Sequence, residues 1–401
     1  MANEATDDAD LLLVLSAEVL KQDEELADIR RAVFEVLLSK AWRIAMRSRH
    51  YLTTKCLDPP SESAWMILYK YGNDVNFLNA TSLTRPTFNQ LLRRFSRFYF
   101  IPRHNARGRP PKLRHHHQVL GLLLSFYVGS MEQTTLCLVF GVPPSTLSRT
   151  LRRGERALAS TLKGYAPARI SWPSPSRQVE LAMLVEAREP LLQHTFGFID
   201  GKNLRVQQPS NSDLQNAMYN GWLHTVFVTG TICFAADGCI IWAKHNCPGS
   251  WNDSDTSLGF RNKLLDPVCC PDPRKNVVSD SAFPCSTSMA GRILTPLKDG
   301  DLDRILPSLR SSARTLHNAI TSVRQAAEWG MGSIQKAYHR LNLPLPYDPE
   351  LRGVRIDNFF RMCNYRVRTV GISQIRTTFL GETDPFDFYR VSYERLCIFE
   401  A

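Results

Sequence analysis

The sequence has 401 residues, 43% of them hydrophobic and 22% charged, so it is long enough for two or three domains and too apolar to be mainly disordered. The formal net charge of +11 predicts an anionic partner, with nucleic acid the first candidate and an acidic membrane surface the second. The ten cysteines lack the spacing of a zinc site, and we expect them to be reduced thiols.

The N-terminal residues predict one amphipathic helix over about 10–49, in which acids and bases are interleaved. Four acids precede its apolar stretch, whereas a secretory signal requires bases there. The longest apolar window, residues 120–131, is too short to cross a membrane. We therefore expect a soluble intracellular protein, located in the nucleus if its partner is DNA.

Further helices are expected from residue 63 and over 84–98, so that residues 1–190 are mainly helical. Residues 107–112 are similar to the core of an AT-hook, whose arginines enter a narrow minor groove. A proline-stiffened hinge in a solvated basic segment is the structural alternative, and we assign no metal to His115, His116 and His117. Residues 85–118 contain no acid and nine bases that suit phosphate: Arg85, Arg93, Arg94, Arg97, Arg103, Arg107, Arg109, Lys112 and Arg114.

Three helices follow that basic segment. Residues 118–127 and 131–140 predict the first two, and the third begins at Pro143 and Pro144 after a break at Gly141. This is the layout of a helix-turn-helix, whose second helix lies in the DNA major groove. We favour DNA contact over plain three-helix packing, because the last helix carries Arg149, Arg152, Arg153 and Arg156.

After residue 175 the pattern changes from helices to strands. One β-type run ends at Asp200, residues 224–243 predict a hairpin that turns near residue 238, and residues 276–280 form another β-type run. We expect a helix over 253–265, capped by Ser250, Asn252 or Asp253, and a long helix over 311–341. This order of elements predicts a mixed α/β domain.

Three acids in this domain are candidates for catalysis. Asp200 and Asp280 each end a β-type run, and Glu328 lies among small and apolar residues of the long helix. Carboxylates brought together repel by on the order of 4 kcal/mol per pair at 4 Å, which bound cations relieve. Two Mg²⁺ ions in such a site activate a water or a 3′-hydroxyl and stabilise the leaving oxygen of a phosphodiester. The structural alternatives are that the aspartates cap turns and that Glu328 pairs with Arg324.

Together these segments resemble the PIF/Harbinger transposases and the Harbinger transposase-derived nucleases of the DDE superfamily, over about residues 81–379. Asn252, Ser279 and Phe283 stand where the family has His, Gly and Tyr, and none of these changes removes a metal ligand. The matching motifs are Asp200-Gly201, Gln215, Tyr219-Asn220-Gly221-Trp222-Leu223-His224, Gly249-Ser250-Trp251-Asn252-Asp253, Ser279-Asp280-Ser281-Ala282-Phe283-Pro284, and Glu328 with Gly332 and Lys336.

The resemblance implies an RNase H-like core, a mixed sheet flanked by helices, in which Asp200, Asp280 and Glu328 bind divalent Mg²⁺ or Mn²⁺. It implies an endonuclease and strand transferase that cuts and joins double-stranded DNA at transposon ends and in target DNA. It also implies a Myb-like accessory protein, with the acidic N-terminal helix as a candidate docking site.

We interpret Asp253 as a helix cap rather than a ligand. Sequence proximity to the acids suggests that Lys202, Arg205 and Lys336 hold the scissile strand. The expected parts are an N-terminal helical region (1–80), a DNA-binding region with the helix-turn-helix (81–190), a nuclease domain (191–380) and a tail (381–401).

Two competing interpretations exist for the whole chain. The first is a domesticated, transposase-derived DNA-binding protein without nuclease activity, which we rank second because all three acids persist. The second is a plain helical scaffold, which leaves the strand-borne aspartates and the acid-free basic segment unexplained. The sequence leaves the oligomeric state open, and a homo-oligomer is compatible with it.

Overall fold

The computed structural model describes residues 4–381 except 51, 53, 103–109, 222–223, 282 and 284–288; in addition, the side chains of 4–10, 45–50 and 54 are not described. The chain divides into two compact units, Met1–Leu57 and Asp58–Ala401. The boundaries expected at residues 190 and 380 fall inside the second unit and stay predictions. Within the described part of the chain, no helix is long and apolar enough to span a membrane.

The first unit consists of one long helix, α1 (Glu4–His50), followed by a single 3-10 turn (Thr54–Cys56). The amphipathic helix predicted over residues 10–49 is therefore confirmed. Every described side chain of α1, from residue 11 to residue 44, is exposed. Over residues 11–44, the helix accordingly has no packing partner among the described residues of its own unit.

The second unit begins with a helical part around an aromatic core. Trp65 stacks on Phe140 at a centroid distance of 5.4 Å and meets Phe88 at 5.8 Å. This part confirms a mainly helical region up to residue 190, although the helix expected over 84–98 ends at Phe95. Its helices are α2 (Ala64–Tyr71), α3 (Asp74–Thr81), α4 (Arg85–Phe95), α5 (His116–Val128), α6 (Gln133–Phe140), α7 (Pro144–Leu162) and α8 (Pro175–Arg188).

A mixed sheet follows, in the order β4-β3-β1-β5-β6, with the short β2 also paired to β3. β1, β3 and β4 are antiparallel, whereas β5 and β6 run parallel to β1. The predicted hairpin is confirmed as β3 and β4, whose turn contains Gly238 at φ +83°. The chain is thus a mixed α/β protein, with β1 (Thr195–Arg205), β2 (Tyr219–Asn220), β3 (Thr225–Ala235), β4 (Ile240–Pro248), β5 (Asn276–Val278) and β6 (Ile293–Leu294).

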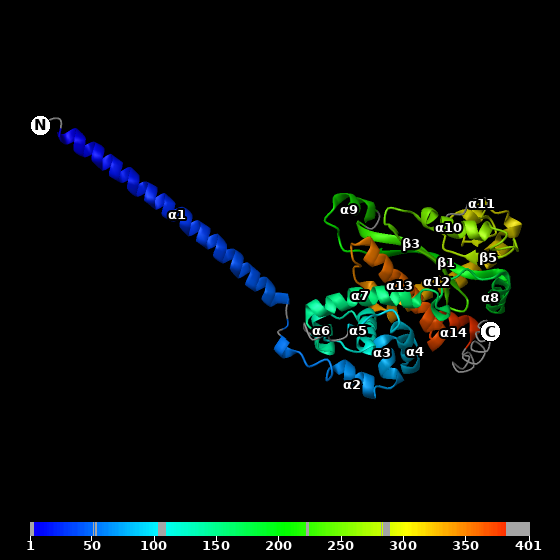
Figure 1. Cartoon of the computed structure of the whole chain (residues 1–401). Helices are drawn as coiled ribbons and strands as arrows, with labels where there is room; N and C mark the ends of the chain where they lie inside the picture. The colour runs from blue at the N-terminus through cyan, green and yellow to red at the C-terminus, as the bar shows by residue number, and fades with distance from the viewer. Residues whose placement is uncertain are drawn as a thin grey trace. The chain divides into compact units, whose positions relative to one another are not determined.

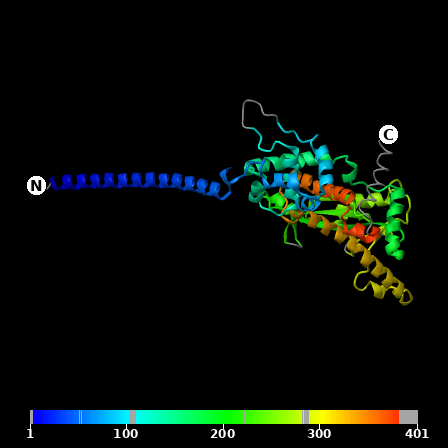
Figure 2. The ribbon, with the colours of Figure 1, turned by 90° about the horizontal axis from the view of Figure 1, so that it is seen from below.

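Helices α10 (Asp253–Leu265) and α12 (Arg310–Ala337) cover opposite faces of this sheet (Figure 1). On one face, the hydroxyls of Thr231 in β3 and Thr256 in α10 are hydrogen-bonded at 2.6 Å. On the other face, Gly330 of α12 lies so close to Phe234 of β3 that a Cβ would come within 2.7 Å of the ring. The N-terminal half of α12, with α11 (Asp301–Arg304) beside it, projects beyond the sheet (Figure 2).

Helix α13 (Pro349–Val370) joins the helical part to the sheet, because it packs against both α7 and β4. Arg355 of α13 donates to the Glu155 carboxylate of α7 from Nε at 2.6 Å and from Nη2 at 3.1 Å. Tyr127 of α5 donates to Glu155 Oε1 at 3.2 Å, and Asn358 donates to Tyr127 Oη at 3.1 Å. This buried network fixes three helices to one another. The shorter helices are α9 (Ser212–Met218) and α14 (Gln374–Leu380).

Candidate active site

The site lies where two parallel strands of the sheet separate. β1 and β5 are paired up to Phe198 and Val278, and beyond that point the register continues only between β1 and β3. Asp200 follows Phe198 by two residues, and Asp280 follows Val278 by two residues. Both aspartates therefore lie where β1 and β5 separate, and such an opening between strands is a common location of ligand sites in open α/β sheets.

The sequence had suggested that the strand ends at Asp200, but the strand continues past it. β1 continues to Arg205, and each residue of this extension pairs with β3, from Asp200 opposite Ile232 to Arg205 opposite Phe227. The expected end at Asp200 was wrong because pairing with β3 overrides the weak strand preference of the polar segment that follows. Asp200 is thus held in mid-strand.

Ser279 fastens the two strands between the two aspartates. Its hydroxyl donates to the Ile199 carbonyl of β1 at 3.0 Å, and its backbone N–H donates to the Leu294 carbonyl of β6 at 2.9 Å. The side chain is buried. Ser279 thus contributes a bond that a glycine at this position would lack.

A third aspartate, Asp253, lies in the first turn of α10, near enough for its charge to act on Asp200 and for that of Asp280 to act on it. The cap of this helix is Asn252, whose side chain accepts from the Asp255 N–H at 3.0 Å, so that the carboxylate of Asp253 is not needed as the cap. A Cβ added to Gly201 would lie 2.4 Å from Asp253 Oδ1. Asp253 therefore occupies the space that a side chain at position 201 would need.

The sequence-based interpretation of Asp253 as the helix cap was wrong, because Asn252 is the cap. The available signal was its position in the Gly249-Ser250-Trp251-Asn252-Asp253 motif, in which Asn252 already supplies a capping side chain. Because Asn252 supplies the capping oxygen, the carboxylate of Asp253 is free of that role.

The aspartates form a local excess of negative charge. Burial, followed by the charge of Asp280, raises the pKa of Asp200 to about 6, with smaller increases from Asp253 and Glu328 and an opposing backbone hydrogen bond from Gly201. Burial and then Asp280 also raise the pKa of Asp253. Among the described residues, no basic side chain contributes to either shift. The site therefore favours a cation that the chain does not itself supply.

Glu328 lies at the edge of this cluster. Its side chain is 57% exposed, and its Oε1 is 3.0 Å from Nη1 of Arg324, one helical turn earlier. This is the pairing that the structural alternative predicted, yet the charge of Glu328 still acts on Asp200. Over the described ranges, no three His, Cys, Asp or Glu side chains are arranged to hold a metal ion. The charges of Asp200, Asp253 and Asp280 thus interact, and Glu328 lies at their edge, but the described acids do not form a ready-made metal site.

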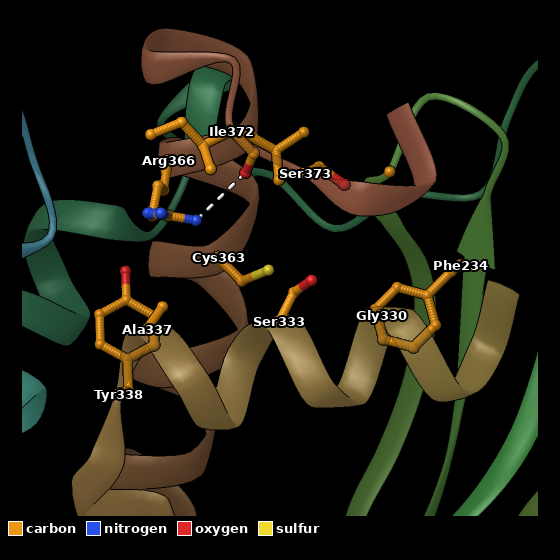
Figure 3. A pocket seen from close by; sticks show the side chains of 11 residues that line it. Phe234, Gly330, Ser333, Ala337, Tyr338, Cys363, Arg366, Ile372 and Ser373 are labelled. Carbon is orange, nitrogen blue, oxygen red and sulfur yellow. Dashed lines mark hydrogen bonds between the residues drawn. The ribbon is translucent and has the colours of Figure 1, made fainter. Parts of the chain in front are cut away.

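Helix α12 is packed tightly behind Glu328. Gly330, Ser333 and Tyr338 line a cavity of about 10 Å³ against Phe234 and α13 (Figure 3). Such a volume has room for one water molecule and none for a substrate. A larger cavity, about 190 Å³, lies among α2, α3, α5 and α6 and is lined without any ionisable side chain. Neither cavity competes with the aspartates as a catalytic site.

The predicted DNA-binding residues of α7 face solvent. α6 ends at Gly141, which has φ +66°, and α7 begins three residues later. Arg149 and Arg152 are exposed. Arg153 donates to the Phe100 carbonyl at 3.1 Å, and Arg156 pairs with Glu350 at 3.3 Å with both side chains mostly exposed. Arg107 and Arg109 of the AT-hook-like segment lie outside the described residues.

The three bases expected at the scissile strand differ in their position relative to Asp200 and Glu328. Lys202 follows Asp200 by two residues in β1, on the same face of the sheet, and is half-buried. Arg205 is exposed and lies on the opposite face of β1 by strand alternation. Lys336 is exposed, two turns after Glu328 in α12. Lys202 is thus the base that the strand directs to the same side as Asp200.

Comparison with known proteins finds one family model that matches this region. Residues 199–364 match the family model of the DDE superfamily endonucleases. This match includes Asp200, Asp253, Asp280 and Glu328 and extends through α12 into α13. No curated protein sequence matches the chain.

One of the similar solved structures is described as the crystal structure of the Mos1 mariner paired end complex with Mn. The identity is 13%, and the alignment covers 70% of this chain and 94% of that chain. The TM-score is 0.16, too low for the likeness to support a structural argument. The family-model match therefore stands on the sequence of residues 199–364.

Proposed function

We propose that the chain is a metal-dependent DNA endonuclease and strand transferase of the DDE transposase kind, related to the PIF/Harbinger group and built on an RNase H-like core. One observation carries the proposal: the charges of Asp200, Asp253 and Asp280 act on one another within the segment that matches the DDE endonuclease model, and no described base contributes to the pKa shifts of Asp200 and Asp253. The order of the sheet and the separation of β1 from β5 support the assignment, because they direct two of the acids to one opening.

The donor set fits a divalent cation. All of the gathered groups are carboxylates, the hard oxygen ligands that suit Mg²⁺ and Mn²⁺. Burial and the neighbouring acid Asp280 raise the pKa of Asp200, and no base among the described residues opposes this shift, as is expected of a carboxylate that binds a cation. When bound, one or two such ions would supply a nucleophile at neutral pH and stabilise charge on a phosphodiester.

The chain's own residues would position the ions and the scissile phosphate. Asp200, fixed in mid-strand, and Asp280 would hold the ions in a constant position, and Asp253 would add a third carboxylate from α10. Glu328 would complete the set after giving up its bond to Arg324, which lies on the surface of α12. Lys202, on the same face as Asp200, would orient the scissile phosphate.

DNA would be held by the helical part of the same unit. The α6–α7 pair has the layout of a helix-turn-helix, and Arg149 and Arg152 extend from the exposed face of α7. We further propose that the protein acts on transposon ends in the nucleus, with a Myb-like accessory protein as its partner.

One observation favours a second candidate, the domesticated DNA-binding protein without nuclease activity. Glu328 is engaged by Arg324, and the described acids do not form a ready-made metal site. If the Arg324–Glu328 pair persists in the presence of DNA and metal, the three aspartates alone would have to support cleavage. This candidate retains the DNA-binding arginines and loses the chemistry.

Cleavage of a terminal-repeat duplex in Mg²⁺ or Mn²⁺ tests these candidates. We expect Asp280→Asn to lower the cleavage rate by about 10³-fold or more, since a metal ligand supplies several kcal/mol of transition-state stabilisation. Asp303→Asn is the matched control, because Asp303 is an exposed acid of α11 outside the cluster.

The outcomes are distinct. Equal activity of the chain and Asp280→Asn would remove Asp280 from catalysis. Absence of cleavage by the unaltered chain, with intact DNA binding, would favour the domesticated candidate. A loss in Asp303→Asn as large as that in Asp280→Asn would contradict a local role for the aspartate cluster.

A further inference from the structure

Helix α1 exposes apolar side chains that nothing in its own unit covers. Leu26, the least exposed of its large apolar residues, is 48% exposed, and Leu12 is 68% exposed. The exposed stretch extends from Leu11 to Ile44. A contiguous apolar surface of this kind in a single helix indicates a protein–protein contact.

The apolar side chains follow a seven-residue repeat. Moving this repeat by one residue toward the C-terminus would bring Asp23 and Arg30 into the apolar row, and moving it the other way would bring in Lys21 and other charged residues. The sequence therefore favours one register. Alternating spacings of three and four residues are the pattern of a coiled coil, in which each such side chain inserts among four from the facing helix. With the polar exception of Gln22, the row consists of Leu12, Leu15, Val19, Leu26, Ile29, Val33 and Val36.

We propose that α1 pairs with α1 of a second copy of this chain in an antiparallel coiled coil. The charges at the two ends set the direction. In a parallel pair, each end would face its own copy and like charges would repel, whereas an antiparallel pair places acids against bases. The first turns carry the acids Glu4, Asp7, Asp8 and Asp10, and the last turns carry the bases Lys40, Arg43, Arg47 and Arg49.

The repeat fits this antiparallel pairing without a shift. A two-fold axis at residue 24 makes every layer an apolar or neutral pair from one end of the row to the other. One layer further out, the same register sets Asp8 opposite the partner's Lys40. The row contains four kinds of layer, each of which occurs twice because of the two-fold axis. They pair Leu12 with the partner's Val36, Leu15 with the partner's Val33, Val19 with the partner's Ile29, and Gln22 with the partner's Leu26.

The central part of the pair carries a local cost. Asp23 and Glu25 flank the axis, so each lies near its own copy in the second chain. These positions are solvent-exposed at the edges of the row, where salt screens like charges. The inner apolar layers and the opposite charges at both ends outweigh this repulsion.

The first experiment compares two adjacent residues of similar exposure in the full chain. Val19 lies in the row and is 59% exposed, whereas Leu20 lies beside it and is 65% exposed. By light scattering at micromolar concentration, we expect the unaltered chain and Leu20→Asp to have twice the mass of one chain and Val19→Asp to have the mass of one. Both substitutions place the same residue in the same helix, so a general loss of helicity would affect them equally.

The second experiment tests direction by exchanging charges. Lys40→Glu alone and Asp8→Lys alone should each weaken the dimer, because each sets like charges opposite one another in the antiparallel pair. The double variant should restore the affinity. In a parallel pair, each residue faces its own copy, so neither single exchange would change the interaction and the double variant would restore nothing.

Each other result overturns the proposal. If the unaltered chain is a monomer, α1 does not pair with its own copy, and its apolar row would instead bind a different protein, such as the Myb-like partner. A dimer that survives Val19→Asp would form through another surface, and equal loss in Val19→Asp and Leu20→Asp would exclude the seven-residue repeat. None of these measurements depends on DNA cleavage, so the inference stands or fails apart from the nuclease proposal.

Discussion

Glu155 and Asp200 are both carboxylates withdrawn from solvent, and their surroundings are opposite. Glu155 is fully buried and receives two hydrogen bonds from Arg355 and one from Tyr127. Asp200 is surrounded by other acids, and no described base contributes to its ionisation. Among the described residues the first charge is compensated by bases and the second is not, which is the difference expected between an acid that stabilises the fold and one that we propose binds a ligand.

The largest effect is expected where the internal compensation is removed. Arg355→Met leaves Glu155 buried and unpaired, which should lower the free energy of unfolding by about 3–5 kcal/mol. Arg156→Met is the control, because Arg156 pairs with Glu350 on the surface and contributes at most about 1 kcal/mol. Urea denaturation measures both, and similar small losses would mean that the buried pair is not required for stability.

Asp200 should respond with the opposite sign. In EDTA at pH 7.5, Asp200→Asn removes a charge whose pKa is raised from 3.8 to about 6, so the free energy of unfolding should increase by roughly 2–3 kcal/mol. The measurement is again urea denaturation, with Asp303→Asn as the control. A loss of stability in Asp200→Asn would show that the acids are compensated after all.

A smaller effect is expected from Gly201→Ala. The added Cβ would collide with the Asp253 carboxylate and displace it, which should weaken Mg²⁺ binding by about 10-fold to 100-fold. Gly259→Ala in the same helix as Asp253 meets only an ordinary contact with Trp242 and should bind as the unaltered chain does. Calorimetric titration would decide, and unchanged affinity in Gly201→Ala would remove Asp253 from the metal site.

Metal-dependent stabilisation should follow the ionisation of Asp200. Its folded pKa of about 6 exceeds the ordinary 3.8, so the metal-free chain loses stability as the pH rises from about 4 to 6. Mg²⁺ requires the ionised form, so the increase in Tm on adding Mg²⁺ should be small at pH 5 and larger at pH 7.5. An increase that does not vary with pH, measured by thermal denaturation, would contradict binding at Asp200.

The smallest effects are expected at the DNA-binding surface. Arg149→Ala and Arg152→Ala should each reduce the slope of log affinity against log salt by about one unit, if each side chain contacts one phosphate. Arg274→Ala should leave the slope unchanged, because Arg274 is already paired with Asp272 at 3.0 Å. Fluorescence anisotropy at several salt concentrations gives the slopes, and identical slopes in all the proteins would exclude α7 from phosphate contact.

The sequence predicts much of the sheet and its flanking helices, because strand alternation, the Asp-Gly turn and the helical periodicity are local signals. It does not predict α13. Arg352 and Arg355 interrupt the apolar pattern of that helix, and their buried guanidinium groups donate to partners distant in the sequence, Asn246 and Glu155. No local pattern carries that information.

For the site, the sequence predicted which strands present Asp200 and Asp280, and it gave the Arg324–Glu328 pair as an alternative that the structure contains. It did not predict Asp253, because the competition between neighbouring side chains for the role of helix cap is decided by backbone geometry. Convergence of the acids depends on how β1, β5 and α10 pack, which is a property of the tertiary structure.

The extension of β1 past Asp200 makes this residue a fixed reference point. Backbone bonds to β3 hold the strand on either side of it, so the arrival of an ion or a DNA strand cannot readily shift its Cα. Adjustment must then come from side chains at the margin, of which Glu328 on α12 is the most exposed. The rate at which the active site forms would accordingly depend on how quickly Glu328 leaves Arg324 and turns toward Asp200.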